Sequence, residues 1–346
     1  METNRTSSIQ TAGLQQHKGE PSARELRSLV GIVASALICS FASAALAQSY
    51  PMKPITIVTP NPPASTPDLV GRAIAQKLSE AWRQPVVMDN KPGGGAIIGT
   101  EAVARAAPDG YTLLLHTATH AIGPSMHKQL PYDPVKSFTP ISMLAFVPNV
   151  LVTHPTLPVK NVKELIALAK SRPGKLDYSS SGPGTPAHLA GELFKTMTGV
   201  DIMHIPYKGS TQALTAVLAG ETVLMFSPVP IALPHIRSGK LKVLGVTTVN
   251  RSKVVPDLPT ISETGLRGYE VTNWYGMQAP AGTPPDIVTK LNAELRRVLT
   301  MPDVVQKLVV QGAEPAPSTA EALQAHVKSE IAKWAKVVKV SGAVVN

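Results

Sequence analysis

Two long extended runs constrain the fold of this chain more than any other feature. The first reads "FTPISMLAFVPNVLVTH" (Phe138–His154) and the second reads "YEVTNWYGMQAP" (Tyr269–Pro280). Each is long enough to leave one domain and enter another, so the chain should leave its first domain and later return to it. This layout predicts an α/β protein of two hinged lobes, each a mixed sheet flanked by helices, joined by crossing strands around a cleft.

Elsewhere, short apolar runs alternate with segments of helical periodicity, as βα units do. In the first lobe we expect strands at Ile55–Thr59, 85–89 and Tyr111–His116, and helices at Asp68–Trp82 and Ala96–Ala106. In the second lobe we expect strands near Leu176–Ser179, Asp201–Ile205, Thr222–Phe226 and Leu241–Thr247, and a helix capped by Asn161. After the second crossing we expect only helices, which begin at Thr283-Pro284, near Met301-Pro302 and at Ser318.

The N-terminus has the pattern of a secretory signal peptide. Arg24 and Arg27 precede "SLVGIVASALICSFASAALA", an uncharged run of 20 residues that ends in an A-x-A site at Ala47. A membrane anchor is the alternative, since that length would span a bilayer, but the many Ala and Ser residues favour cleavage near Ala47. The polar stretch before Arg24 leaves the true start codon open. Ile38 is too large for a lipoprotein site at Cys39.

Composition excludes several classes of function. Cys39 is the only cysteine and falls in the leader, which removes disulfides, thiolate catalysis and cysteine metal sites from the mature chain. The formal net charge is +10, but no polybasic run indicates a nucleic-acid partner. A diffusely basic exported protein suits small anions. No cofactor or metal site is indicated.

Two helix starts offer an anion site. Thr185-Pro186 in "YSSSGPGTPAHLAGELF" and Thr66-Pro67 in "PNPPASTPDLVGR" each look like an N-cap followed by proline. Such a terminus presents free N–H groups and a partial positive charge. If the lobes face each other, both termini converge on one cleft. The alternative is that Thr-Pro only caps helices, as Thr283-Pro284 does.

Other chemistries find less support in the sequence. No G-x-x-x-x-G-K-[ST], G-x-G-x-x-G or G-x-S-x-G string occurs, and the S-x-x-K match at Ser125–Lys128 lacks its companion motifs. His116 and His120 are spaced for a metal only on a helix, and we expect them to diverge because His116 ends a strand. His204 reads as a structural residue, whereas His120 and His188 either line the cleft or are structural.

Each charged residue near the predicted cleft has a structural and a functional interpretation. Asp68 would complement its helix dipole, and functionally it would orient the loop or pair with a ligand amine rather than contact a carboxylate. Lys208 in "IPYKGS" adds positive potential at the cleft mouth or is a solvated lysine, and Ser210 is the expected N-cap of the next helix. Aromatic residues make up only 4% of the chain, which disfavours a sugar ligand.

Seven strings together resemble a known family. They resemble the substrate-binding receptors of tripartite tricarboxylate transporters, the Bug-type family, in order and at family spacing from about Tyr50 to Lys339. The strings are "ITIVTPNPPASTPDLVGR", "NKPGGGAIIGT", "AAPDGYTLL", "SSGPGTPAHLAGELF", "IPYKGSTQALTAVLAGE", "PHIRSGKLKVLGVTT" and "PDLPTISETGL".

The resemblance implies a periplasmic-binding-protein (Venus flytrap) fold. The expected division is a signal peptide at 1–47, a first lobe at 48–148, a second lobe at 149–270 and a return to the first lobe at 271–346. The implied function is a monomeric, non-enzymatic periplasmic receptor that closes on a small organic acid and delivers it to a large and a small integral-membrane transporter subunit. A di- or tricarboxylate is the expected ligand, with an aromatic carboxylate as a further option.

The resemblance also implies where the ligand binds. Contacts come from the first βα loop (Asn61 to Asp68) and the second-lobe loop (Ser179 to His188). The expected ligand-binding residues are Asn61, Ser65, Thr66, Asp68, Thr117, His120, Ser181, Gly184, Thr185, His188, Tyr207, Lys208 and Ser227.

This chain departs from the family pattern at two points. Pro63-Ala64-Ser65 replaces consecutive glycines, which stiffens the first loop. Ser227 stands where the family often has Asp, which makes a simple carboxylate a better ligand than an amino acid.

Two rival functions remain from the sequence. The first is a receptor that reports its ligand to a signalling partner. The second is a secreted α/β hydrolase, which would require a Ser hydroxyl, a His and a carboxylate in hydrogen-bonding sequence.

Overall fold

A computed structural model describes residues 50–342 of the chain. The chain divides into two units, Met1–Tyr50 and Pro51–Asn346, and the account below concerns the second. The predicted signal peptide at 1–47, its cleavage near Ala47 and Cys39 lie outside the described residues.

The first lobe is built around buried parallel strands. β1 (Ile55–Thr59) lies between β2 (Val86–Asn90) and β3 (Thr112–Thr117) and is parallel to both. β9 (Thr272–Pro280) pairs antiparallel with β3 and so brings the late part of the chain back into this sheet. Four of the five residues of β1 are buried because helices cover both faces, which explains its continuous apolar sequence.

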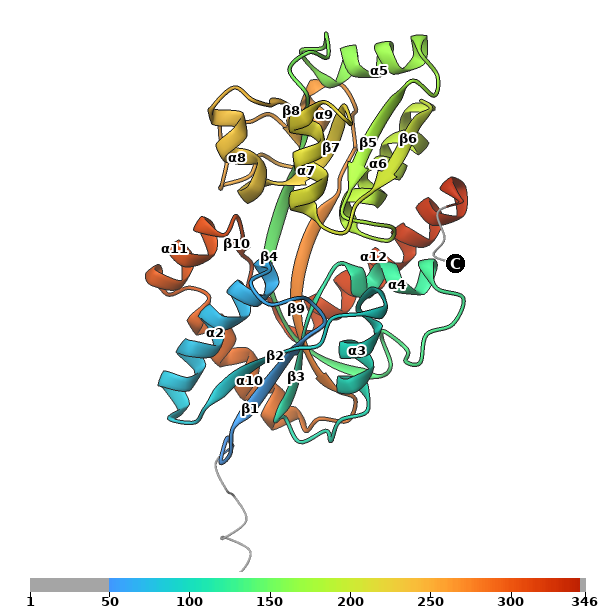
Figure 1. The fold of residues 1–346 in the computed structure, drawn as a ribbon. Helices are drawn as coiled ribbons and strands as arrows, with labels where there is room; N and C mark the ends of the chain where they lie inside the picture. The colour runs from blue at the N-terminus through green and yellow to red at the C-terminus, as the bar shows by residue number, and fades with distance from the viewer. Residues whose placement is uncertain (1–49, 343–346) are drawn as a thin grey trace, which may run out of the picture. The chain divides into compact units, whose positions relative to one another are not determined.

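A single long strand carries the chain from the first lobe into the second. β4 (Phe138–Thr153) pairs antiparallel with β9 over Phe138–Pro148, and its last five residues then pair with β7 (Leu224–Pro228). Sixteen residues at ~3.3 Å each span about 50 Å, enough to run through both lobes. Figure 1 shows β4 and β9 side by side as the two strands that run between the lobes.

The second lobe repeats the parallel pattern. β5 (Leu176–Ser180) lies between β6 (Ile202–Pro206) and β7 and is parallel to both, while β8 (Lys242–Val246) pairs antiparallel with the end of β4. The helices of this lobe are α5 (Val162–Ser171), α6 (Pro186–Thr198), α7 (Ser210–Ala219), α8 (Val229–Arg237) and α9 (Ile261–Thr264).

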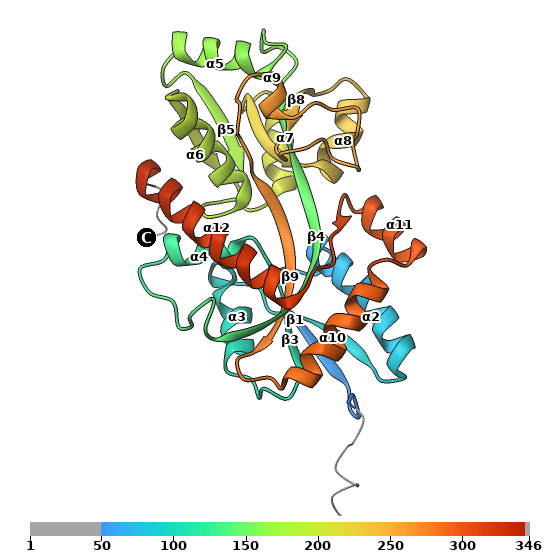
Figure 2. The same cartoon turned by 180° about the vertical axis from the view of Figure 1, so that it is seen from behind.

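The remaining helices surround the first sheet. They are α2 (Thr66–Trp82), the 3-10 turn η1 (Gly94–Ala96), α3 (Ile97–Ala104), α4 (Thr119–Met126), α10 (Pro285–Val298), α11 (Pro302–Val310) and α12 (Ala320–Ser341). α12 packs against α4 and β4 and also reaches α6 of the second lobe (Figure 2). None of the helices within residues 50–342 combines the length and apolar character needed to cross a membrane.

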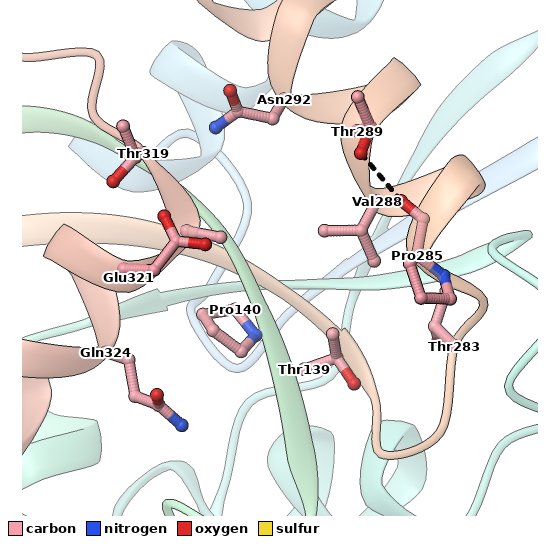
Figure 3. A pocket seen from close by; sticks show the side chains of 11 residues that line it. Thr139, Pro140, Thr283, Pro285, Val288, Thr289, Asn292, Thr319, Glu321 and Gln324 are labelled. Atoms are coloured by element: carbon pink, nitrogen blue, oxygen red, sulfur yellow. Dashed lines mark hydrogen bonds between the residues drawn. The ribbon is translucent and has the colours of Figure 1, made fainter.

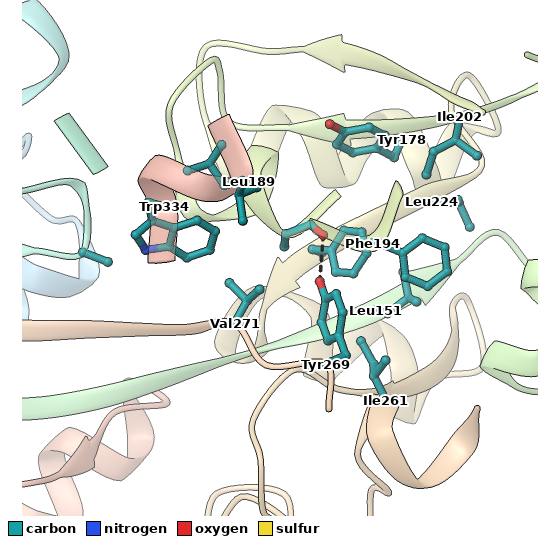
Figure 4. Packing of buried hydrophobic residues seen from close by; sticks show 14 of the residues in the cluster. Leu151, Tyr178, Leu189, Phe194, Ile202, Leu224, Ile261, Tyr269, Val271 and Trp334 are labelled. Atoms are coloured by element: carbon teal, nitrogen blue, oxygen red, sulfur yellow. Dashed lines mark hydrogen bonds between the residues drawn. The ribbon is translucent and has the colours of Figure 1, made fainter. Parts of the chain in front are cut away.

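One hydrophobic cluster is continuous from α4 and α12 into the second lobe. Trp334 of α12 lies near Leu189 of α6 (Figure 4). In the same cluster, the rings of Phe194 and Tyr269 both pack against Phe226. The Tyr269 hydroxyl donates to the backbone carbonyl of α6 at Ala190, with an O···O distance of 2.8 Å. Burial of each large apolar side chain in this cluster stabilises the folded state by about 1.5–3 kcal/mol.

The two-lobed α/β fold and the alternation of strands and helices are confirmed, with boundaries shifted by up to three residues. The expectation of helices only after β9 is wrong, because β10 (Glu314–Pro315) pairs with Ala145 and Phe146 of β4. Glu314 also accepts a hydrogen bond from Ser252 of the second lobe. A two-residue strand has no periodicity from which to predict it.

Several helix starts differ from the expected ones by one or two residues, and α12 begins at Ala320 rather than at Ser318. Ser65, not Thr66, is the N-cap of α2, and Gly209, not Ser210, is that of α7. α10 begins at Pro285 rather than at Pro284. Thr185 does cap α6, and Asn161 caps α5, as predicted. The lobe boundaries proposed from the sequence stay predictions.

We predict opposite effects for the same substitution at two helical glycines. A Cβ on Gly191 of α6 would overlap the Tyr178 ring, so Gly191→Ala should lower the free energy of unfolding by about 1–3 kcal/mol. A Cβ on Gly123 of α4 would meet nothing closer than Leu130 Cδ1 at 3.9 Å, so Gly123→Ala should be neutral or raise it by about 0.5–1 kcal/mol. Urea unfolding measures both. A Gly191→Ala protein as stable as the parent would contradict this packing.

Candidate functional site

Segments from both lobes line one cavity of about 600 Å³. Asn61 follows β1, Gly94–Ile97 follow β2, and Pro183–Thr185 precede α6. All three stand at the carboxyl ends of parallel strands, where α/β sheets bind ligands. Of the residues predicted from the sequence, the cavity brings together Asn61, Gly184 and Thr185.

One face of α4 forms a further wall. Thr119, Ile122, Gly123, Met126 and His127 all line the cavity. Their spacing of three, four, seven and eight residues places them on a single side of a helix. Thr119 stands at the start of α4 and His127 directly follows its last residue. The wall is therefore polar at one end, apolar along its length, and ends in an imidazole.

The electrostatics of the cavity suit an anion. Among the described residues that line it, there is no Asp, Glu, Lys or Arg. The beginnings of α3 and α4 and the loop before α6 all border it, and a helix start carries about half a positive charge. An anion held here would meet neutral N–H and O–H donors without a competing carboxylate.

Asp68 organises the first loop rather than facing the cavity. Its carboxylate is 1% exposed and accepts hydrogen bonds from Ala64 N (2.8 Å), Arg72 Nε (3.0 Å) and Asn90 Nδ2 (3.0 Å). Burial opposes ionisation, but these donors outweigh it and hold the pKa of Asp68 below its usual value. Asn90 Nδ2 also donates to the carbonyl of Asn61. The buried carboxylate thus fixes Asn61, which lines the cavity.

The first loop departs from the family pattern at Pro63-Ala64-Ser65, and its backbone is strained at Ala64. Ala64 has φ of 61°, in the left-handed region that favours glycine. For an L-residue this conformation costs roughly 1–2 kcal/mol. The hydrogen bond from Ala64 N to Asp68 holds the residue there.

In the second loop, several of the predicted free N–H donors are already used. Gly184 N donates to His188 Nδ1 (3.1 Å), Gly182 N donates to Ser180 Oγ (3.1 Å), and His188 N donates to Thr185 Oγ1 (3.4 Å). The loop is therefore preformed and its own side chains hold its shape. His188 N, one of the N–H groups at the start of α6, is therefore not free to bind a ligand.

A buried polar network supports this loop from behind. The rings of His188 and His204 stack with centroids 4.1 Å apart, and His204 Nε2 lies 2.6 Å from Ser180 Oγ. Burial lowers the pKa of each of these histidines to about 4, and His188 adds to the effect on His204. Tyr178 donates to Glu192. Both imidazoles are therefore neutral near pH 7.

The same network does not form a hydrolytic triad. Ser180 is fully buried, and within the described residues no carboxylate hydrogen-bonds to His204. With its pKa lowered to about 4, His204 is also too weak a base to activate a hydroxyl near neutral pH. The Ser–His contact is structural.

The prediction that His116 and His120 diverge is wrong. Their ring centroids are 4.5 Å apart, because β3 turns into α4 within two residues and folds His120 back beside His116. Both are buried, and His120 Nε2 lies 2.9 Å from the Pro134 carbonyl oxygen. Burial lowers the pKa of His120 to about 4. Among the described residues, no group of three or more His, Cys, Asp or Glu is placed to hold a metal.

The other predicted residues do not line the cavity. Thr117 Oγ1 donates to Thr119 Oγ1 at 3.2 Å and so orients a lining residue. Ser65 Oγ donates to the Pro62 carbonyl, and Thr66 hydrogen-bonds to Tyr275. Ser181 and Tyr207 are half-buried, Lys208 is exposed and Ser227 is fully buried.

A second pocket, of about 470 Å³, lies within the first lobe (Figure 3). Glu321 and Gln324 of α12 lie on the opposite side of it from Val288 and Thr289 of α10. The Glu321 carboxylate would repel an anion. Asn292 is already engaged with the Ile141 and Ser318 carbonyls. The first cavity therefore remains the candidate site.

Residues 70–343 match the family described as "Tripartite tricarboxylate transporter family receptor". The chain belongs to this family. Protein BugT of Bordetella pertussis is 38% identical over 321 residues, which span 92% of this chain and 98% of that protein. The family consists of substrate-binding receptors, so this receptor is not an enzyme.

Solved structures agree with that assignment. "R. palustris Rpa4515 with adipate" superposes with a TM-score of 0.77 and 39% identity, covering 86% of this receptor and 99% of that chain. "MatC (Rpa3494) from Rhodopseudomonas palustris with bound malate" gives a TM-score of 0.73 and 32% identity, covering 84% and 100%.

Sequence reasoning missed most of the residues that line the receptor's cavity. The glycine loop Gly94–Ala96 and the α4 face with Thr119 and His127 were not among the predicted site residues. The signal for the first was present in "NKPGGGAIIGT", three glycines between a strand and a helix. The signal for the second was the helical spacing of Thr119, Ile122 and Met126, which reads equally well as a core face.

We predict that the receptor loses stability between pH 6.5 and pH 4. Unfolded histidines bind protons near pH 6.5, whereas folded His120, His188 and His204 do so near pH 4. In that window the unfolded chain binds more protons, so the free energy of unfolding falls as pH falls, by up to about 1.4 kcal/mol per pH unit for each histidine. Urea unfolding at pH 7.5, 6 and 5 measures the slope.

The control is a pair of variants. His120→Gln removes one buried titrating group and should make the slope shallower. His235→Gln on α8 should leave it unchanged. Equal slopes in all three proteins would show that His120 is not held neutral by burial.

Proposed function

We propose that this chain is a periplasmic receptor that binds a small organic carboxylate in the cavity between its lobes. The observation that carries the proposal is the cavity itself, which combines loops from both lobes with three helix beginnings and has no acidic side chain among its described lining residues. A ligand bridging both sides would favour the closed form over the open one.

The relatives support a carboxylate as the ligand class. Rpa4515 was solved with adipate and MatC with malate, both of them dicarboxylates. By similarity, we infer a carboxylate for this chain. The described residues that line the cavity include no acid to pair with a ligand amine, which favours a simple organic acid over an amino acid.

Delivery to a membrane transporter follows from the family. We infer that the loaded receptor docks on the large and small membrane subunits of a tripartite tricarboxylate-type transporter. Export through the N-terminal leader would place the receptor in the periplasm, where such a handover takes place.

The energetics of this scheme are reasonable. Hydrogen bonds to a charged group contribute roughly 1.5–3 kcal/mol each. Five such bonds, less the cost of ordering the loops and closing the lobes, would leave about 8 kcal/mol, which is micromolar affinity. The preformed second loop reduces the ordering cost.

We predict that a carboxylate raises the unfolding midpoint of the purified receptor. A ligand present at 100 times its dissociation constant stabilises the folded form by about 2.7 kcal/mol, a shift of several degrees. The compounds to screen by thermal unfolding are adipate, malate, citrate, benzoate, glutamate, an amine and a neutral sugar. Shifts with the amine or the sugar alone would reject an anion site.

Two N-cap variants locate the site. Thr185→Ala removes a cap that lines the proposed cavity, whereas Thr319→Ala removes a comparable cap, at the start of α12, that lines the second pocket. Each should cost about 1 kcal/mol of stability without ligand. Only Thr185→Ala should also reduce the ligand-induced shift. Loss of the shift in Thr319→Ala instead would move the site to the second pocket.

A further inference from the structure

We propose that His127 is a specificity-determining residue of this receptor, whose imidazole binds a second anionic group at the far end of an elongated ligand with an apolar middle. This inference rests on the proposed function, because it concerns the ligand of the same cavity. It adds a residue and a ligand shape that the family assignment does not supply.

The length of the α4 wall sets the shape of the ligand. Thr119 and His127 are eight residues apart, which is about 12 Å along a helix axis at 1.5 Å per residue. Between them, the cavity is bordered by Ile122 and Met126, whose apolar side chains also pack in the core, and Gly123 leaves its part of the wall open. A ligand that runs along this face from the polar start of α4 would bury its middle against hydrocarbon and bring its other end to His127.

His127 is available to bind that end. Within the described residues its side chain has no hydrogen-bond partner, and it is only half-buried. Its backbone is fixed, since His127 N donates to the Gly123 carbonyl at 3.1 Å. Gly95 stands opposite, and a Cβ there would lie 3.1 Å from His127 Nε2, so a side chain at that position would crowd the imidazole. Gly95 has φ of 64°, which also favours glycine.

The charges around His127 favour an anion reaching it from the cavity. Lys128 is adjacent and exposed, and Tyr132 and Asp133 line a neighbouring groove together with His127. Asp133 is engaged with the N–H groups of Val135 (2.8 Å) and Lys136 (2.9 Å). Of the described residues that line the cavity, His127 is the only histidine. A carboxylate at this end therefore meets a donor that is stronger when protonated.

The ligand class that fits is a dicarboxylate whose two acid groups are separated by a chain of several methylenes. A short hydroxylated diacid would leave His127 unreached and place polar groups against Ile122 and Met126. A monocarboxylate of the same chain length would fill the apolar wall but gain nothing from the imidazole. Affinity for the diacid should rise as pH falls, and affinity for the monoacid should not.

Calorimetric titration with adipate and with hexanoate, at pH 6.0 and 8.0, tests this proposal. For the unmodified receptor we expect adipate to bind about 10-fold more tightly at pH 6.0, as one charge-assisted hydrogen bond predicts, and hexanoate to change less than about 2-fold. In His127→Gln the pH dependence for adipate should disappear while hexanoate binding stays the same. His127→Lys keeps a positive charge at both pH values, so it should bind adipate tightly at both.

His235→Gln is the matched control, since His235 is a half-buried histidine on α8 that does not line the cavity. It should retain the pH dependence of the unmodified receptor. If His127→Gln still binds adipate with the same pH dependence, His127 does not have the proposed role. The proposed function would still stand. Absence of binding by both anions, and by every other carboxylate in the screen, would overturn both.

Discussion

The antiparallel pairing of β4 with β9 is the interaction on which the rest of the structure depends. β4 enters the second lobe only after its first eleven residues have paired with β9, and β9 then pairs with β3 to close the first sheet. This pairing therefore belongs to the first sheet and fixes where both crossing strands leave it. The loops that line the cavity owe their places to the strands arranged on either side of this pair.

The described residues that line the cavity include no Asp, Glu, Lys or Arg, so a ligand there meets no fully charged side chain. The potential of the cavity comes from helix beginnings, while the ionised and titratable groups nearby are used to shape the loops: Asp68 holds Asn61 in place, and His188 accepts from Gly184. A site made of neutral donors avoids the large desolvation cost of a buried cation. It also leaves selectivity to shape and to the few side chains at the ends of the cavity, which can differ among receptors of one fold.

The sequence allowed most of the fold to be predicted, but only the smaller part of the candidate site. Strands and helices followed from periodicity, and the loops at Asn61 and Thr185 followed from the rule that ligands sit at strand ends. The rest required tertiary information. Ile122 and Met126 have the spacing of a core face, and nothing in the sequence says that this face meets a cavity. The approach of His116 to His120 depends on the tightness of one strand-to-helix turn, and β10 exists only because β4 lies beside it.

The C-terminal helix constrains how such a receptor can open. α12 belongs to the returning part of the chain, yet Trp334 packs in the same continuous cluster as Leu189 of the second lobe. Bending at the crossing strands alone would separate Trp334 from Leu189 and expose the indole ring of Trp334 to water. If the lobes move apart, α6 would have to slide along α12 for this contact to be kept, which is a shear motion at a packed interface. α12 would then limit both the direction and the extent of the lobe movement.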